Sequence, residues 1–441
     1  MAAAQLWLAH RYFGFLTGDE VEVLAEAFRV ARGFHYRAWE IRNLFVPDFV
    51  VAPAIRIAHA LGVRDTARLI EAAALPSIAL SIVTVFLVRA LALRWSEGDE
   101  RAATIASLLF AFHWIPLAFG STAYPRTLAA ACIAGGALLL ESRHTRWAAV
   151  AAGALAGLAF ADRFSEIVFL IPLLLLARRR ALFVCAGAAV AIAITVGWYD
   201  FVTWGSPFSS AIDFASLTLA RPDFASRVKM QSPVWYFANL ARWCSPALLP
   251  LLWLSRDRRP WLFVAMPLVA LSAVQHKELR YLQVLVPFLA IAAAIGFARM
   301  RNRRVAIALV VIALVTNALG VRGFARKSMP AVLAARDLGA DPNVHVIAVS
   351  QLWAIGDRLY VGDRMHVRDL GTPPVRVATS LAGADAALLY ETDLDQPALV
   401  AELAAQHLIA ERTYRDGPAR AVVLFRRRLR SAAMQSPLSK R

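Results

Sequence analysis

The feature that most constrains this chain is a succession of long apolar segments separated by short, arginine-rich connections. About 20 consecutive apolar residues are enough for a helix to cross a bilayer. Inside lipid each backbone polar group needs an internal partner, so such segments fold as helices. The chain has 59% hydrophobic and 18% charged residues and a mean hydropathy of +0.54, which is unlike a soluble globular protein. The sequence therefore predicts an α-helical polytopic membrane protein.

The apolar segments predict about eleven transmembrane helices. Residues 1–16 are short for a complete span and lack the cleavage site of a signal peptide. We interpret them as a first helix that can lack its N-terminal part. The other expected spans are residues 66–93, 103–120, 124–140, 147–161, 164–177, 181–199, 236–254, 261–275, 281–298 and 305–321.

The arginine clusters predict the orientation of these helices, because cytoplasmic loops carry an excess of cations. Five basic connections alternate with the others and can all be cytoplasmic: residues 94–101, 143–146, 178–180, 256–259 and 299–304. The opposite, extracytoplasmic side then receives residues 17–65, 121–126, 162–163, 200–235, the segment around His276 and the C-terminus. This distribution accounts for the net charge of +17 without nucleic-acid binding.

The cysteines bear on disulfide and metal sites, and the lysine and alanine content bears on the source of the chain. Three cysteines in apolar stretches predict neither a disulfide framework nor a metal site: Cys132, Cys185 and Cys244. Only four of the 48 Lys and Arg residues are lysine, and alanine is abundant, which is typical of a GC-rich bacterial genome. We therefore expect a multi-pass protein of the bacterial inner (cytoplasmic) membrane.

The composition changes after Arg322. Residues 344–349, 386–390 and 421–425 are typical of short buried strands, whereas residues 331–338 and 398–408 have helical spacing. We expect a transmembrane domain at 1–322, a small extracytoplasmic α/β domain at 323–430 and a disordered tail at 431–441.

A cluster of ionisable residues interrupts the apolar pattern at His276, Lys277, Glu278 and Arg280. Charges beside lipid are costly unless they pair or bind a ligand, so the cluster is a candidate functional site. The alternative is a polar turn whose charges face water.

The first loop supplies a second candidate. Thr17 and Glu20 have the spacing of a capping box, which predicts an amphipathic helix lying in the membrane interface. Capping leaves Asp19 unexplained. A carboxylate at the membrane edge is a candidate general base, because partial desolvation can raise its pKa.

Residues 32–43 mix aromatic and cationic side chains. This mixture is typical of an interfacial belt, although Glu40 and Arg42 could instead complete a polar site facing Asp19. No cluster has the spacing of a zinc site, and a divalent cation near Asp19 and Glu20 remains an alternative. We therefore assign no certain cofactor.

Several stretches, taken in order, carry a resemblance to one family. They are Gly18-Asp19-Glu20, Gly33-Phe34-His35-Tyr36 leading into Trp39-Glu40, Arg42-Asn43 with Pro47, and His276-Lys277-Glu278-Leu279-Arg280-Tyr281. The pattern resembles the GT-C-fold mannosyltransferases that use dolichyl-phosphate-mannose to build GPI anchors and lipid-linked N-glycan precursors. Weaker similarities occur at Asp162-Arg163-Phe164 and at Asp200–Gly205, followed by Asp213-Phe214.

The chain also departs from the family pattern. It has Thr17-Gly18 for a His-Pro pair, Ala38 and Ile41 within the Thr-Trp-Glu-Trp motif, Asn43 for Ser, Tyr281 for Phe, and Tyr124-Pro125-Arg126-Thr127 where many members have Asn-Ser. The resemblance covers the membrane part and says little about residues beyond 322.

The resemblance implies that Asp19 is the base and that the 276–280 cluster helps to bind donor and acceptor. Glu20, Glu40, Arg42 and Arg163 are further candidates for binding. Independently of the family, cations such as Lys277, Arg280 and Arg163 would stabilise the charge that develops on a departing phosphate. One carboxylate that deprotonates an acceptor hydroxyl would suffice, and direct attack would invert the anomeric configuration.

The sequence therefore predicts an inverting glycosyltransferase that moves a hexose, by resemblance mannose, from a polyprenyl-phosphate donor to an extracytoplasmic glycan, glycolipid or protein. One alternative is a transporter or flippase of lipid-linked sugars. In transporters, however, polar residues gather near the bilayer midplane, whereas here they gather at one face. A non-catalytic cell-envelope subunit is the other alternative, because the departure at Thr17-Gly18 could mark lost activity.

Overall fold

The computed structural model describes residues 1–12, 18–123, 126–220, 230–325, 330–351, 358–371, 374–415 and 421–428. The chain forms two compact units, one made of most of residues 1–326 and one made of most of residues 327–441. The expected tail at 431–441 and the expected N-cap Thr17 lie outside the described residues.

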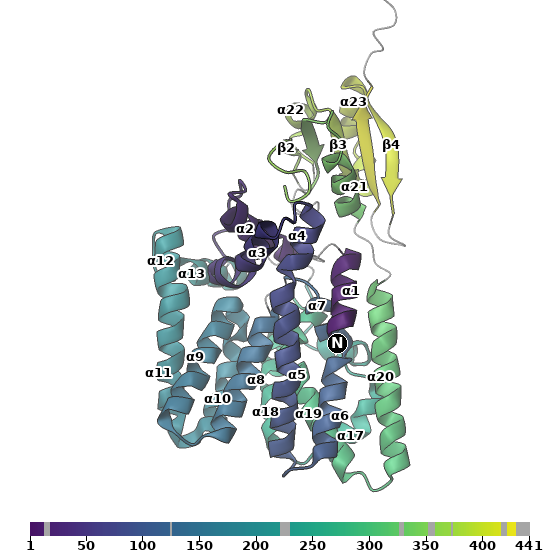
Figure 1. The fold of residues 1–441 in the computed structure, drawn as a ribbon. Helices are drawn as coiled ribbons and strands as arrows, with labels where there is room; N and C mark the ends of the chain where they lie inside the picture. The colour runs from purple at the N-terminus through teal and green to yellow at the C-terminus, as the bar shows by residue number, and fades with distance from the viewer. Residues whose placement is uncertain are drawn as a thin grey trace, which may run out of the picture. The chain divides into compact units, whose positions relative to one another are not determined.

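The first unit is a bundle of helices that run side by side (Figure 1). Its long members are α5 (Leu75–Trp95), α6 (Glu100–Ala111), α8 (Arg126–Ser142), α9 (Arg146–Asp162), α10 (Leu170–Ala177), α11 (Ala181–Ile192), α18 (Arg258–Ala273), α19 (Val286–Arg299) and α20 (Arg303–Ala325). Asp99, Thr145 and Asp257 cap the helices that follow three of the basic connections, because each side chain accepts a hydrogen bond from a first-turn amide. The predicted basic loops are thus sharp turns between helices.

Within the described ranges, three helical runs are long and apolar enough to cross a membrane: Thr66–Trp95, Phe164–Trp204 and Arg303–Phe324. The second run is not straight, because Arg178 has a φ of 51° and α10 packs back against α11. The expected span at 103–120 is interrupted between α6 and α7 (Trp114–Phe119), where His113 caps α7. The expected count of eleven spans stays a prediction.

The expected span at 236–254 is a series of short helices. They are α15 (Trp235–Ala238), α16 (Leu240–Trp243), the 3₁₀ turn η6 (Pro246–Leu248) and α17 (Leu249–Leu254). Pro246 and Pro250 each remove a backbone donor, so a single regular helix cannot run through this stretch.

Small residues bring the helices into close contact. A Cβ atom added to Gly153 of α9 would lie 2.0 Å from the carbonyl oxygen of Val184, and one added to Gly187 of α11 would lie 1.9 Å from that of Val150. The backbones of α9 and α11 therefore touch, as is common in membrane bundles. This contact fixes α11 and the helices that continue it, the π-helical turn η4 (Ala193–Trp198) and α12 (Tyr199–Trp204).

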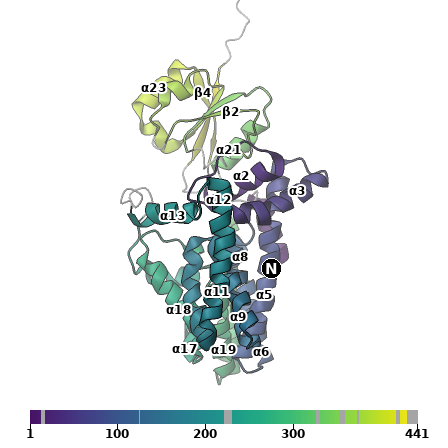
Figure 2. The ribbon, with the colours of Figure 1, turned by 90° about the vertical axis from the view of Figure 1, so that its left-hand side faces the viewer.

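Several shorter helices gather at one end of the bundle (Figures 1 and 2). They are α2 (Gly18–Arg32), η1 (Pro47–Val51), α3 (Ala52–Ala60), α4 (Thr66–Ala73), α12 and α13 (Ser209–Ala215), and α1 (Ala2–Tyr12) leads towards them. The amphipathic helix predicted in the first loop is α2, which buries Val21, Leu24 and Phe28. This helix also buries the side chain of Glu26, which is ion-paired with Arg29.

The second unit contains a five-stranded sheet of order β2-β1-β3-β5-β4. Its strands are β1 (Val346–Val349), β2 (His366–Asp369), β3 (Ala386–Tyr390), β4 (Leu408–Tyr414) and β5 (Val422–Arg427), with helices α21 (Pro330–Gly339), α22 (Val377–Leu381) and α23 (Pro397–Ala405). β1 pairs in parallel with β2 and β3, whereas β5 is antiparallel to β3 and β4. This is the small α/β unit that the sequence predicts after Arg322.

Candidate active site

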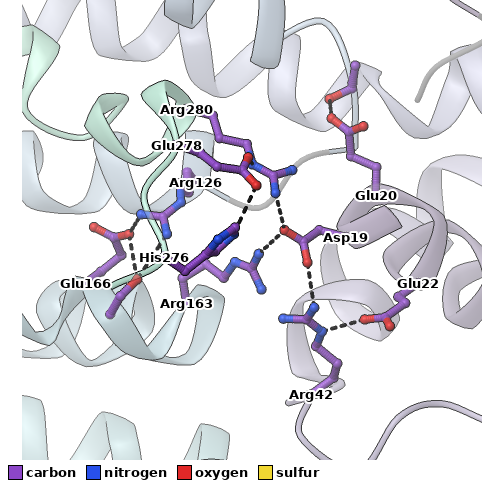
Figure 3. A network of polar contacts seen from close by, with 12 residues as sticks. Asp19, Glu20, Glu22, Arg42, Arg126, Arg163, Glu166, His276, Glu278 and Arg280 are labelled. Carbon is purple, nitrogen blue, oxygen red and sulfur yellow. Dashed lines mark hydrogen bonds and ion pairs between the residues drawn. The ribbon is translucent and has the colours of Figure 1, made fainter. Parts of the chain in front are cut away.

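Asp19 lies in the first turn of α2, at the end of the bundle where the shorter helices gather. It is the centre of a polar cluster (Figure 3). Its Oδ2 accepts from Arg163 Nη2 at 2.6 Å and lies 3.1 Å from Arg280 Nη2. Its Oδ1 accepts from Arg42 Nη2 at 2.5 Å. One carboxylate therefore holds three guanidinium groups, each from a different part of the chain.

Each of these arginines lies outside the long helices, in a loop, at a helix end or in a short 3₁₀ helix. Arg163 follows α9 in extended conformation and precedes the 3₁₀ helix η2 (Phe164–Phe169). Arg280 lies in the short 3₁₀ helix η7 (Leu279–Leu282) before α19, and Arg42 lies in the loop after α2. The fold thus joins the first loop, the 162–163 connection and the 276–280 cluster, which the sequence placed on one side of the membrane.

The electrostatics of Asp19 differ from the expectation. Burial alone would raise its pKa, but the positive charges of Arg163, Arg42 and Arg280, with a smaller effect of Arg126, outweigh burial and hold the pKa well below its usual range. The expectation of a raised pKa is therefore wrong. Asp19 is an ionised carboxylate whose lone pairs are engaged by arginine.

The arginines around Asp19 have further carboxylate partners. Arg42 Nε donates to Glu22 Oε2 at 2.5 Å, and the Arg280 guanidinium is paired with Glu278. The pKa of Glu278 is lowered: burial would raise it, but a hydrogen bond with His276 and the charge of Arg280 outweigh burial. His276 Nε2 lies 3.1 Å from Glu278 Oε1. These contacts hold the arginine side chains in place.

A second, deeper layer was not predicted from the sequence. Arg126 at the start of α8 is buried, forms an ion pair with Glu166 and donates to Ser165 Oγ at 3.1 Å. Its guanidinium also lies 4.4 Å from the centre of the Tyr281 ring. The sequence signal for this pair was an arginine and a glutamate at the starts of two apolar segments. Charges are tolerated at such positions only when they are paired.

Two expected site residues lie outside the Asp19 cluster. Glu20 is fully buried, and its Oε1 accepts from Thr122 Oγ1 at 2.7 Å. Glu40 is exposed and pairs with Arg37 at 3.0 Å. Of the two candidates in the 32–43 segment, the structure brings only Arg42 to Asp19.

Lys277 is also placed differently from the expectation of a phosphate-binding cation. Its Nζ donates to the main-chain carbonyls of Val274 and, at 3.2 Å, Gln231. It directly follows a short antiparallel pairing between residues 230–231 and 275–276. Burial lowers the pKa of Lys277. These contacts make it a tether between two segments.

The described residues include no group of three or more His, Cys, Asp or Glu side chains arranged to hold a metal ion. The oxygens of Asp19 contact three arginine side chains. A divalent cation at this carboxylate would have to displace at least one guanidinium.

Solved structures similar to this chain define the class of fold. ArnT from Cupriavidus metallidurans in the apo state matches with a TM-score of 0.64 and 15% identity, over 96% of both chains. The same protein bound to undecaprenyl phosphate matches with a TM-score of 0.63 and 16% identity, again over 96% of both. Arabinofuranosyltransferase AftD from Mycobacteria gives 0.58 and 15%, over 96% of this chain and 39% of AftD. The chain has the GT-C fold of membrane glycosyltransferases.

A family model narrows this class. Residues 30–338 match the Alg9-like mannosyltransferase family, and the chain belongs to that family. No curated protein shows a significant sequence match. The predicted GT-C resemblance, helical membrane fold and glycosyltransferase activity are confirmed. Family membership also favours an enzyme over the transporter and the non-catalytic subunit.

Proposed function

We propose that this protein transfers mannose from a polyprenyl-phosphate donor to a hydroxyl group of an extracytoplasmic glycan, glycolipid or protein, with inversion at the anomeric carbon. The observation that carries the proposal is the carboxylate of Asp19 held by three arginines at one end of a membrane bundle. Membership of a mannosyltransferase family supports the choice of sugar. The ArnT structure with undecaprenyl phosphate supports the choice of donor class.

The donor phosphate would bind two of the arginines that contact Asp19. A phosphodiester-linked sugar carries one negative charge, and the departing polyprenyl phosphate gains a second when the glycosidic bond breaks. Arg163 and Arg280 each present a guanidinium that can bind a phosphate oxygen. Cations that face the developing charge stabilise the transition state more than the ground state.

The same exchange would convert Asp19 into a useful base. While three arginines surround it, its lowered pKa makes it a weak proton acceptor. If the donor phosphate takes over Arg163 and Arg280, Asp19 retains Arg42 on Oδ1 and regains a free Oδ2. Its pKa then rises towards the ordinary range, so donor binding prepares the residue that deprotonates the acceptor hydroxyl.

The reaction balances without a second acid. Asp19 accepts the hydroxyl proton, the acceptor oxygen forms a bond to the anomeric carbon, and the bond from that carbon to the phosphate oxygen breaks. The electron pair leaves with the polyprenyl phosphate. We place this site on the periplasmic face of a bacterial inner membrane, because the basic loops lie at the other ends of the helices.

The test is transfer of labelled mannose by purified protein in detergent. Undecaprenyl-phosphate-mannose would serve as donor and an extract of the source cell envelope as acceptor. We expect the native protein to label an acceptor and Asp19→Asn to lose at least about 100-fold in rate, as when a general base is removed. Asp213→Asn is the matched control, because Asp213 is an exposed carboxylate on α13. Unchanged transfer by Asp19→Asn would remove this residue from the mechanism.

A further inference from the structure

The position of Arg42 depends on a separate set of contacts that the reaction chemistry does not use. Arg42 lies in an irregular segment between α2 and η1, where no helix or strand fixes a long side chain. Its carbonyl oxygen accepts from Trp204 Nε1 at 3.1 Å. The next residue, Asn43, is anchored more firmly. Hydrogen bonds to α12 and to residues next to it therefore hold both Arg42 and Asn43.

Both polar atoms of the Asn43 side-chain amide form hydrogen bonds that hold this segment. Its Nδ2 donates to Thr195 O at 2.9 Å and to Asp200 Oδ1 at 3.0 Å. Its Oδ1 accepts from the backbone amide of Phe45 at 3.1 Å. Thr195 belongs to the π-helical turn η4, a type of irregularity that is frequent at functional sites. One side chain thus ties the Arg42 loop to η4 and α12.

Asp200, in the first turn of α12, completes the connection. Its side chain is fully buried, and its second oxygen accepts from the backbone amide of Ser210 at 2.9 Å and from Ser210 Oγ at 2.6 Å. One oxygen therefore faces Asn43, and the other faces the first turn of α13. Both contacts need an acceptor.

This geometry explains why a carboxylate stands at position 200. An asparagine there would have only one acceptor oxygen, and its amide nitrogen would face a donor, either Asn43 Nδ2 or the Ser210 amide. A buried donor that faces another donor loses its hydrogen bond and costs free energy. Asp200 is therefore suited to brace two segments at once.

We propose that Asp200 and Asn43 are positioning residues that fix the Arg42 loop against α12, so that the guanidinium of Arg42 meets Oδ1 of Asp19. This inference rests on the proposed function for its catalytic consequence. Neither residue touches the reacting atoms. Their effect on transfer passes through Arg42.

The first test is hydrogen–deuterium exchange of the purified full-length protein, which needs no substrate. We expect Asp200→Asn and Asn43→Ala to speed exchange of peptides covering residues 37–46 by about tenfold, since local opening exposes these amides. Peptides from α18 and α19 should keep their native rates. Asp213→Asn, which removes an exposed carboxylate from neighbouring α13, should change neither set. Native exchange over 37–46 in both variants would overturn the proposal.

The second test is a double-mutant comparison of mannose transfer from undecaprenyl-phosphate-mannose to the envelope extract. We expect Asp200→Asn to lower kcat/KM by about 10- to 100-fold, as small displacements of site groups do. In an Arg42→Gln background the same substitution should change kcat/KM by less than about twofold. Independent losses that multiply would show a general structural role and overturn the proposal. Absence of transfer by the native protein would instead refute the proposed function, while the exchange test would still decide the bracing.

Discussion

Substitution of Asp19 by Asn should tighten the binding of a phosphate lipid, even though it abolishes transfer. Asp19 competes with the donor phosphate for Arg163 and Arg280, which contact its Oδ2 at 2.6 and 3.1 Å. Asn removes the negative charge and keeps the size of the side chain. Both guanidiniums then lose one negatively charged partner, while Arg280 keeps its ion pair with Glu278.

The size of the effect follows from the charges. A phosphate on the far side of an arginine would lie about 6 Å from Asp19, where two like unit charges repel by about 3 kcal/mol at an effective dielectric constant of 20. Asp19 is 15% exposed, so solvent screens part of this repulsion. About half of it would lower Kd by about tenfold.

Undecaprenyl phosphate is the probe for this prediction. Its Kd for the native protein and for Asp19→Asn would be measured by thermophoresis in detergent at one fixed ionic strength, with Asp213→Asn as control. A tighter complex for Asp19→Asn alone is expected. An equal or weaker affinity would refute the idea that Asp19 and phosphate compete for the same arginines.

Three further outcomes are expected. Glu166→Gln leaves buried Arg126 without its counter-charge and should lower the free energy of unfolding by roughly 3 kcal/mol, seen as a lower Tm, whereas a native Tm would contradict the buried pair. Lys277→Met removes the tether to Val274 and Gln231 and should lower Tm, but should leave the undecaprenyl phosphate Kd within about twofold. A large loss of affinity would return Lys277 to the donor site. Asp48 lies in η1, and its carboxyl group accepts a hydrogen bond from the hydroxyl of Tyr199. Burial raises the pKa of Asp48 from 3.8 to about 7, so the native state keeps a proton that the unfolded state releases. Stability should therefore fall as pH rises from roughly 4 to 7, and Asp48→Asn should abolish that part of the pH dependence of Tm; an unchanged pH profile would contradict it.

The helices were predictable where apolar length was the deciding property. α8, α9, α18 and α20 lie within a few residues of the expected segments, because a hydrophobic run bounded by arginines leaves few alternatives. The interruptions were less visible. His113 begins a new short helix inside an apolar run, and Pro246 interrupts another. The sequence contains these residues, but it does not show which of them interrupt a helix in the folded protein.

The second unit shows the same limit in strands. β1, β3 and β5 were predicted because most of their residues are apolar and buried. β2 and β4 lie at the two edges of the sheet, and their side chains are mostly exposed or half-buried. An edge strand buries fewer side chains, so its sequence carries a weaker pattern. Leu408, expected to end a helix, begins β4.

The candidate site was predictable in its members more than in its pairing. Asp19, Arg42, Arg163 and Arg280 were all named from the sequence, but their meeting at one carboxylate depends on tertiary structure. The pKa of Asp19 was predicted in the wrong direction, because desolvation could be inferred from the membrane edge, whereas the contact of all three arginines with this one carboxylate could not.

The chemistry at the anomeric carbon tests the central claim most directly. Native protein in excess over undecaprenyl-phosphate-mannose labelled with ¹³C at C1 would be allowed one turnover with the envelope extract. We expect one undecaprenyl phosphate released for each mannose transferred, and a product whose C1 signal in NMR has the opposite anomeric configuration to the donor. Retention of configuration, or mannose transfer without release of undecaprenyl phosphate, would contradict direct attack promoted by the single carboxylate of Asp19.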